Sequence, residues 1–337
     1  MRCVIALLLA GVAVPGLARA DCAPAPGPVL TLSYDSRYAE DDPDRSRLDE
    51  DREAAAIAAL DPLDGFIQDL ADGLEQALMA DDPALREAGA LCLLAQIGEW
   101  ARGDALAGLE TETVQLTIGA RLAAFAIIAG KAAALAPDSA DLPDIRRWLT
   151  DRMEAQMRFW ETAPDRASQN NLRAWAGLAG AATAALNDDP VMRGWAAWSV
   201  SYVLCSANPD GSLPQEMRRG ALALHYQLHA LAPLVTAVLV LRGQGIDLTD
   251  RCDGALGRAA RFALSDLGAG TKTLAITGQV QSYFDGTDSL GDWQLAWLVP
   301  YLRLDPDPAL AEVAKGLEPL SFSKLGGNQT LIWGGAD

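Results

Sequence analysis

The sequence predicts an all-α fold, an α/α toroid built from antiparallel helical hairpins. Apolar residues recur at three- and four-residue steps along most of the chain, for example at Ile118, Leu122 and Phe125. Three predicted helices are apolar on nearly every side, namely 122–134 (apart from Lys131), 174–186 and 230–241. Such helices need neighbours on both sides, so we expect an inner ring of helices inside an outer ring.

The first twenty residues are typical of a secretory signal peptide. Arg2 precedes an apolar stretch, Val4 to Val14, that is too short to span a bilayer. Ala18-Arg19-Ala20 has the form of a cleavage site. We therefore expect cleavage after Ala20 and a soluble periplasmic or secreted protein.

The segment that follows is rich in proline and then strongly acidic. Residues 29–34 are predicted to form a short extended segment. The charged run from Glu40 to Glu53 is either a solvated loop or helix face, or a flap that carries Arg37 and Tyr38 over a site.

Helices then follow one another without a linker-like stretch, so residues 21–337 are predicted to form a single domain. In Asp82-Pro83 and Asp189-Pro190 the acid can cap a helix and the proline can take its first position. Strand patterns are few, at Thr273–Ile276 and Thr330–Trp333. The predicted helices cover residues 47–59, 62–80, 83–102, 109–136, 140–161, 168–187, 189–206, 214–243, 247–267, 289–303 and 307–318.

Acidic side chains far outnumber basic ones. Without Arg2 and Arg19, which leave with the signal peptide, the chain has 25 basic and 45 acidic side chains and a formal charge of −20. This charge argues against nucleic acid or an anionic membrane surface as a partner. A polyanionic substrate would need a locally basic cleft, because charges are screened beyond about 8 Å at physiological ionic strength. The candidate residues for such a cleft are Arg37, Arg173, Arg218 and Arg219.

Cysteine usage points to disulfides. Four cysteines remain after Cys3 leaves with the signal peptide, and an even number in an exported chain suggests two bridges. The residues alone allow three connectivities among Cys22, Cys92, Cys205 and Cys252.

Polar side chains gather in three apolar settings. The first is Gln169-Asn170-Asn171, at the start of an apolar helix that carries Arg173 and Trp175. One asparagine is enough to cap a helix, so the pair suggests a site, with capping alone as the alternative. Another setting is residues 279–293, where Trp293 and Trp297 share a helix face and either pack in the core or stack on sugar rings.

The remaining setting is the segment 210–229, which holds both histidines of the chain. On one helix, Arg219 and Tyr226 would share a face roughly 10 Å apart, with His229 close to that face and His225 nearer Arg218. The histidine spacing could suit zinc, but no glutamate follows the first histidine and no third ligand is evident. We therefore expect neither a metal nor another cofactor.

Together these segments resemble the alginate (polymannuronate) lyase family. The likeness is most specific in Gln169-Asn170-Asn171 and in the block from Asp210-Gly211-Ser212-Leu213-Pro214 to Ala223-Leu224-His225-Tyr226. It extends from Cys22-Ala23-Pro24 to Leu325-Gly326-Gly327-Asn328-Gln329, and so covers nearly the whole mature chain. The resemblance implies an incomplete α/α toroid with a deep, tunnel-like cleft. It also suggests the disulfides Cys22–Cys92 and Cys205–Cys252.

The resemblance further implies a reaction, the cleavage of 4-linked uronate chains by β-elimination. Asn171 and Arg219 would neutralise the substrate carboxylate and so stabilise a carbanion at C5. Tyr226 would remove the C5 proton and protonate O4. Because a free tyrosine has a pKa of about 10, the nearby guanidinium would have to favour the phenolate. We expect further substrate contacts from Tyr38, Asn170, Arg173, Trp175, Arg218, His225 and His229.

The chain departs from the family pattern after the asparagine pair. The family normally has a histidine there, and this chain has Leu172, which cannot ionise. The residue after the tyrosine, usually histidine, is Gln227. Either His225 or His229 compensates, or the substrate differs, or activity is reduced or absent.

The leading hypothesis is therefore a monomeric polysaccharide lyase acting on mannuronate-rich alginate or a related uronate polymer. The first alternative is a degenerate, non-catalytic periplasmic protein that binds an anionic glycan, which Leu172 motivates. The second is a helical scaffold protein without a sugar site.

Overall fold

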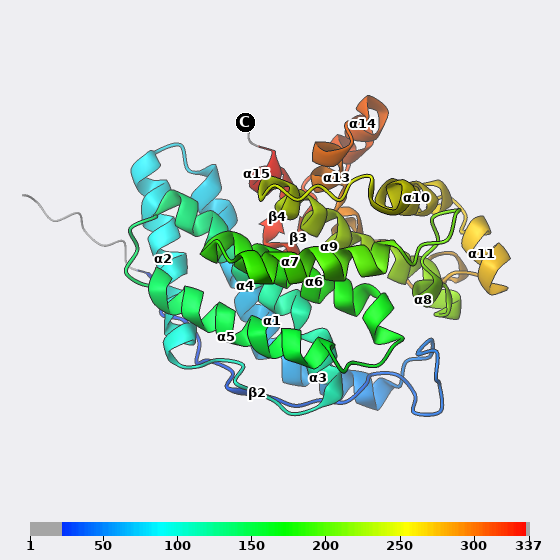
Figure 1. Ribbon diagram of the computed structural model, residues 1–337, viewed down its shortest axis with the longest axis horizontal. Helices are drawn as coiled ribbons and strands as arrows, with labels where there is room; N and C mark the ends of the chain where they lie inside the picture. The colour runs from blue at the N-terminus through cyan, green and yellow to red at the C-terminus, as the bar shows by residue number, and fades with distance from the viewer. Residues whose placement is uncertain (1–21, 335–337) are drawn as a thin grey trace, which may run out of the picture.

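The computed structural model describes residues 22–334, so the signal peptide predicted for residues 1–20 lies outside the described residues. Helices dominate (Figure 1). The long ones are α1 (Glu50–Met79), α2 (Pro83–Arg102), α4 (Gly119–Leu135), α5 (Leu142–Trp160), α6 (Asn171–Asn187), α7 (Pro190–Leu204), α9 (Ala223–Gly243) and α10 (Arg251–Asp266). The short ones are α3 (Glu112–Thr117), α8 (Pro214–Met217), α11 (Thr271–Thr277), α12 (Ser282–Asp285), α13 (Leu298–Leu304), α14 (Pro308–Gly316) and α15 (Gln329–Trp333). Single 3-10 turns are η1 (Ala167–Gln169), η2 (Gly220–Leu222), η3 (Asp292–Leu295) and η4 (Ser323–Leu325).

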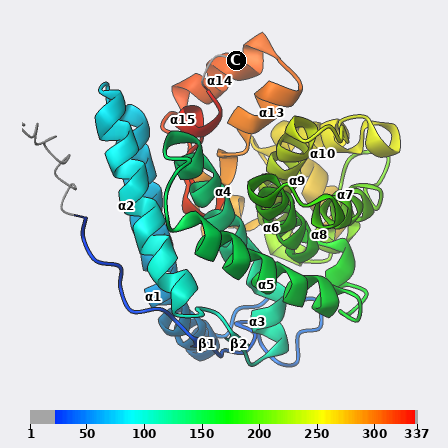
Figure 2. The same cartoon turned by 60° about the vertical axis from the view of Figure 1, so that its left-hand side comes forward.

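The apolar helices form the centre of the molecule, as predicted. Helix α6 packs between α4 and α9, and the outer helices α5, α7 and α10 cover this inner set. Helices α1 and α2 lie side by side at one flank (Figure 2). The outer helix α5 buries one face only, whereas α4, α6 and α9 are buried nearly all round. This arrangement is an α/α toroid, which confirms the predicted fold class.

Helix starts follow the predicted capping chemistry. Helix α2 begins at Pro83, and the Asp82 side chain accepts from the backbone N–H of Ala84. Helix α7 begins at Pro190, and Asp189 caps it in the same way. The acid satisfies an N–H that the first turn leaves free, and proline lacks the N–H that would otherwise need a partner.

Some predicted boundaries were wrong. Residues 47–59 and 62–80 form the single helix α1, because Pro62 lies on its exposed side, where water can satisfy the interrupted backbone group. The predicted helix 109–136 is divided at Ile118 into α3 and α4.

Both short strand predictions were wrong as well. Residues 273–276 belong to α11, which lies between the left-handed glycines Gly270 and Gly278. Residues 330–333 belong to α15, where the Asn328 side chain caps the first turn. The caps at these helix ends outweigh the β-branched residues within them.

The strands that do form are two residues long. Strand β1 (Thr31–Leu32) lies in the predicted extended segment and pairs in parallel with β2 (Gly108–Leu109). Strand β3 (Ser321–Phe322) pairs antiparallel with β4 (Gly327–Asn328). Disulfides join Cys22 to Cys92 on α2, and Cys205 at the end of α7 to Cys252 on α10. The bridges suggested by the resemblance are thus confirmed.

Two helical stretches are long and apolar enough to cross a membrane by composition, Glu112–Leu135 and Gly220–Gly243. Within the fold, 67% and 78% of these apolar windows are buried. Their apolar surface is therefore used in the core of the toroid.

Candidate active site

A cleft of about 810 Å³ opens where the inner helices begin. The first turns of α4, α6 and α9 line it, together with the first half of α1, residues 34–38 and residues 321–324. Three helix N-termini therefore gather at this cleft. The partial positive charge at a helix N-terminus favours anions, so the backbone itself makes the cleft attractive to a negatively charged ligand.

The Tyr226 hydroxyl lies at the centre of a cluster of polar groups. It forms a hydrogen bond with the hydroxyl of Tyr38 and accepts one from Nη2 of Arg37 at 3.1 Å. Arg37 also lies 3.8 Å from the Glu53 carboxylate. The backbone of the charged segment folds back on itself here, through a bridge between Tyr38 and Leu48. The predicted flap carrying Arg37 and Tyr38 therefore does lie over the cleft.

Arg219 reaches Tyr226 from a turn and not from the same helix. The predicted helix 214–243 is divided into α8, η2 and α9, and Gly220 adopts a left-handed conformation (φ +56°) directly after Arg219. A Cβ at Gly220 would meet the Gln279 side chain at 2.7 Å, so the turn needs glycine. As a result the guanidinium lies over the tyrosine, 3.8 Å from the ring centroid of Tyr226. The prediction that Arg219 and Tyr226 share one helix was therefore wrong.

Asn171 faces the same cleft and is held by Glu216, a residue that sequence reasoning did not single out as functional. The backbone N–H and the side-chain Nδ2 of Asn171 both donate to the Glu216 carboxyl group, at 2.7 to 3.2 Å. Burial raises the pKa of Glu216 to about 7, against the opposing influence of Arg219 and of Asn171. An amide carries two N–H donors, so the second N–H of Asn171 can bind a ligand.

The two histidines also line the cleft, and their contacts differ. Burial lowers the pKa of His229 to about 3, so this ring is neutral near pH 7. Its Nε2 accepts from the indole N–H of Trp175 at 3.1 Å, and its Nδ1 has no partner among the described residues. His225 packs against Tyr283 and Trp293 and lies 3.4 Å from the Asp288 carboxylate, so it is not directed at Arg218 as predicted.

Leu172, where the resemblance would have a histidine, forms an apolar wall. It packs against a buried cluster of Leu116, Trp160, Ala167 and Ala176, and it lines both the cleft and a neighbouring cavity of about 180 Å³. Among the described residues, the charged group that bonds to Tyr226 is Arg37. Arg37 thus supplies the polar contact to the tyrosine that Leu172 cannot make.

Three predicted substrate contacts lie outside the cleft. Arg173 is only 2% exposed, because it points to the outer helices and stacks under Trp198 and Tyr202. Asn170 caps α6, and Arg218 forms an ion pair with Asp44; both line only the neighbouring small cavity. The prediction erred for Arg173 because neighbouring helix positions point in directions about 100° apart.

Sequence reasoning also missed a second group of cleft charges. Arg121 on α4 forms two hydrogen bonds to Asp64 on α1, at 2.8 and 2.9 Å, and Lys324 donates to the same carboxylate at 2.6 Å. Burial lowers the pKa of Lys324 to about 8. These residues are far apart in the chain and belong to no motif, so only the fold brings them together.

Comparison with known proteins shows that the chain is similar to alginate lyases. The family model described as alginate lyase matches residues 110–273. An alginate lyase of Pseudomonas putida (strain GB-1) is 27% identical over 93% of this chain and 85% of its own length. A polysaccharide lyase of Stenotrophomonas maltophilia (strain K279a) is 29% identical over 80% of this chain and 78% of its own length.

Solved structures share the fold. The structure of alginate lyase A1-III from Sphingomonas species A1 matches with a TM-score of 0.74 and 21% identity, covering 92% of this chain and 85% of that one. A variant of that lyase in complex with a tetrasaccharide matches with a TM-score of 0.78, covering 96% of this chain and 89% of that one. The chain is therefore similar to alginate lyases both in sequence and in fold.

Proposed function

We propose that this protein is a polysaccharide lyase that cleaves alginate by β-elimination at the Tyr226 cleft. The observation that carries the proposal is the convergence of a tyrosine hydroxyl with two guanidinium groups and an amide. Arg37 donates to Tyr226, Arg219 lies over its ring, and Asn171 faces the same space. These groups come from three distant parts of the chain.

The reaction needs a neutralised carboxylate, a base and an acid. Arg219 and the free N–H of Asn171 bind the uronate carboxylate and stabilise the negative charge that develops on C5. The Tyr226 phenolate takes the C5 proton, the bond between C4 and O4 breaks, and the tyrosine returns the proton to O4. In mannuronate the C5 hydrogen and O4 lie on the same side of the ring, so one phenol serves both steps and mannuronate is the preferred residue.

Arg37 takes over the role that the family histidine would have. A positive charge within hydrogen-bond distance of a phenol favours its ionised form, and the guanidinium is held there by Glu53 and by the Tyr38 ring. This contact supports catalysis despite Leu172, and it makes the non-catalytic alternative the less favoured one.

Local positive charge in the cleft allows a protein of negative net charge to bind a polyanionic substrate. Five basic side chains, Arg37, Arg45, Arg121, Arg219 and Lys324, line the cleft beside three helix N-termini, against two acids, Asp35 and Glu53. Because screening confines charge effects to about 8 Å, these local charges act on a bound uronate more strongly than the net charge of the chain does.

The test is turnover by a tyrosine variant. Tyr226→Phe should lower kcat on polymannuronate by about 10²- to 10⁴-fold, the usual range for a lost acid–base group. Product is followed by the ultraviolet absorbance of its unsaturated sugar. Tyr202→Phe, on the outer helix α7, is the matched control and should keep full activity. Equal activity in Tyr226→Phe and the wild type would refute the proposed role of Tyr226.

We also propose that the protein is exported as a monomer after cleavage behind Ala20. Two disulfides support an oxidising compartment. Mass spectrometry of the protein from cell fractions should give a chain that begins at Asp21, and light scattering should give the mass of one chain. A full-length chain in the cytoplasm would contradict the export proposal.

A further inference from the structure

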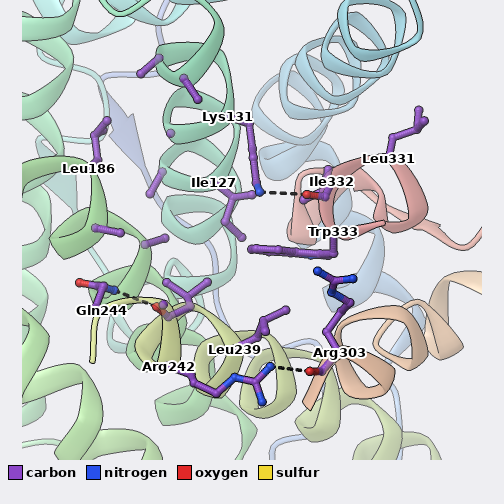
Figure 3. A pocket seen from close by; sticks show the side chains of 18 of the residues that line it. Ile127, Lys131, Leu186, Leu239, Arg242, Gln244, Arg303, Leu331, Ile332 and Trp333 are labelled. Atoms are coloured by element: carbon purple, nitrogen blue, oxygen red, sulfur yellow. Dashed lines mark hydrogen bonds between the residues drawn. The ribbon is translucent and has the colours of Figure 1, made fainter. Parts of the chain in front are cut away.

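The inner helices end at a second pocket, at the opposite end of the toroid from the cleft. It has a volume of about 1080 Å³ and is lined by the last turns of α4, α6 and α9, with contributions from α5, α13 and α15 (Figure 3). Helices α4, α6 and α9 thus connect the two sites: each contributes its first turns to the cleft and its last turns to this pocket. The second pocket has no part in the mechanism above.

The pocket is cationic in a strongly acidic protein. Lys131, Arg146, Arg242 and Arg303 line it, and no described Asp or Glu does. Lys131 donates to the Ile332 carbonyl and lies 4.1 Å from the ring centroid of Trp333, and burial lowers its pKa. None of Lys131, Arg146 and Arg242 forms an ion pair with a carboxylate of the described residues.

Helix capping accounts for only part of this charge. Arg242 donates to the carbonyl of Arg303 (Figure 3) and to that of Leu304, and so caps the end of α13. A helix C-terminus carries about half a negative charge, so the ends of α4, α6, α9 and α13 offset about two positive charges. Lys131, Arg146 and Arg242 alone bring three, and the pocket therefore keeps a positive surplus.

The other lining groups indicate the kind of anion. The last turn of each helix leaves backbone carbonyls without an intrahelical partner. Some are capped here, since Gln244 Nε2 donates to Val240 and the N–H of Gly245 donates to Arg242. Ala134, Leu186 and Gly243 belong to the same turns and also line the pocket. Carbonyls accept hydrogen bonds from hydroxyl groups. Alanine and leucine side chains between them offer an apolar floor. A ligand with carboxylates, hydroxyls and an apolar C–H face matches all three features, and a pocket of this volume is far larger than a small inorganic ion needs.

We propose that this pocket is a second, non-catalytic binding site for uronate oligosaccharides. The choice of uronate rests on the proposed function, because the cleft would generate such oligosaccharides, while the preference for a hydroxylated carboxylate rests on the pocket alone. Arg146 and Lys131 bind carboxylates, and the carbonyls at the ends of α4 and α6, such as those of Ala134 and Leu186, accept sugar hydroxyls.

The test measures how many tetramannuronate molecules bind one chain. Tyr226→Phe serves as the parent so that binding is not followed by cleavage, and calorimetry should show two sites. Adding Lys131→Met and Arg146→Glu should weaken the second site at least about tenfold and leave the cleft affinity within about twofold. Arg158→Glu, on the same helix as Arg146 but paired with Glu154 and outside the pocket, should change neither site.

A second measurement does not depend on variants. Hydrogen exchange in the parent should slow in residues 239–243 and 329–333 when the tetrasaccharide is added, separately from residues around the cleft. A single site by both methods would overturn the proposal, as would equal displacement of the sugar by inorganic phosphate or by laurate. Neutral mannotetraose should not bind. A failure of the proposed lyase function would appear instead as missing turnover in the wild type, with or without protection of residues 239–243 and 329–333.

Discussion

At the cleft end of the inner helices, two sources of positive charge add. Helix N-termini point to the same space as Arg37 and Arg219. Arg37 donates to the hydroxyl of Tyr226, and Arg219 lies over the ring of the same residue. At the opposite end the sources oppose each other, since the cations face helix C-termini. There the contacts of Lys131 and Arg242 are backbone carbonyls and the ring of Trp333.

The difference shows that positive charge alone suits a site to binding, whereas chemistry needs a group that can exchange a proton. Among the described residues, the cleft contains a phenol beside its charges. No described Asp, Glu, His or Tyr lines the pocket at the opposite end. The following experiments test that contrast, beginning with the largest expected effect.

Removing one arginine from each end should separate the two roles. Arg37→Ala should lower kcat on a short mannuronate oligosaccharide by about 10²- to 10³-fold, because the hydrogen bond to Tyr226 is lost and such donors typically contribute that much. Arg146→Ala should leave the rate within about twofold. Initial rates from ultraviolet absorbance measure both effects. Similar rates for the two variants would contradict the difference in role between the two ends.

A second substitution in the Arg37→Ala variant should recover part of its lost rate. If Arg37 does the work of the family histidine, Leu172→His added to Arg37→Ala should recover part of the lost rate, because an imidazole beside the cleft can again assist the tyrosine. Leu172→Phe in the same background is the control that fills space without a polar group. Equal recovery by both would attribute the gain to packing.

Stability should depend on pH through the buried acid of the cleft end. The folded pKa of Glu216, about 7, lies above its ordinary value of 4.5, so the folded state binds this proton more tightly and loses stability as pH rises from 4.5 to 7. The difference corresponds to about 3 kcal/mol of unfolding free energy. Glu216→Gln has no such proton to lose. Its free energy of unfolding should therefore rise relative to that of the wild type as pH increases.

The measurement is urea unfolding of the wild type and Glu216→Gln at about pH 4 and about pH 8. His229 acts in the opposite direction, since its lowered pKa makes stability fall as pH drops below 6.5. Both proteins keep His229, so the difference between them isolates the glutamate. A difference that does not change with pH would contradict the assignment.

The smallest effect concerns the cover of the cleft. Asp44, in the charged segment after Tyr38, pairs with Arg218 at 2.8 Å and with Arg166 at 3.5 Å, and all three side chains are exposed. Such pairs contribute about 0–1 kcal/mol, so Asp44→Asn should raise KM by no more than about fivefold, and less at high salt. Asp41→Asn, which breaks a pair with Arg47 within the same segment, should leave KM unchanged. A large effect of Asp41→Asn would implicate the whole segment instead of this contact.

The sequence allowed the fold to be predicted because its signals are local. Apolar spacing identified α4, α6 and α9 as inner helices, and proline after an acid gave the starts of α2 and α7. Boundaries failed where a single residue decided the outcome, such as the left-handed Gly220 that places Arg219 in a turn.

The site could be predicted only where a motif carried it. Asn171, Arg219 and Tyr226 stand in recognisable segments, and the structure brings them to one cleft. Glu216 stands in such a segment too, but its role depends on burial, which a sequence does not display. Contacts between residues far apart in the chain, such as those of Asp64 with Arg121 and Lys324, leave no local pattern from which they could be predicted.

The segment 22–38 has a consequence for when the cleft can work. It precedes the parts of the chain that hold it in place, namely Cys92 on α2, strand β2, and finally Tyr226, which lies 188 residues beyond Tyr38. Contacts between residues so far apart in sequence form late, because closing long loops costs entropy before the contacts repay it. A nascent or partly folded chain therefore lacks Arg37 and Tyr38 at the cleft, and catalytic competence arrives only with the last stage of folding.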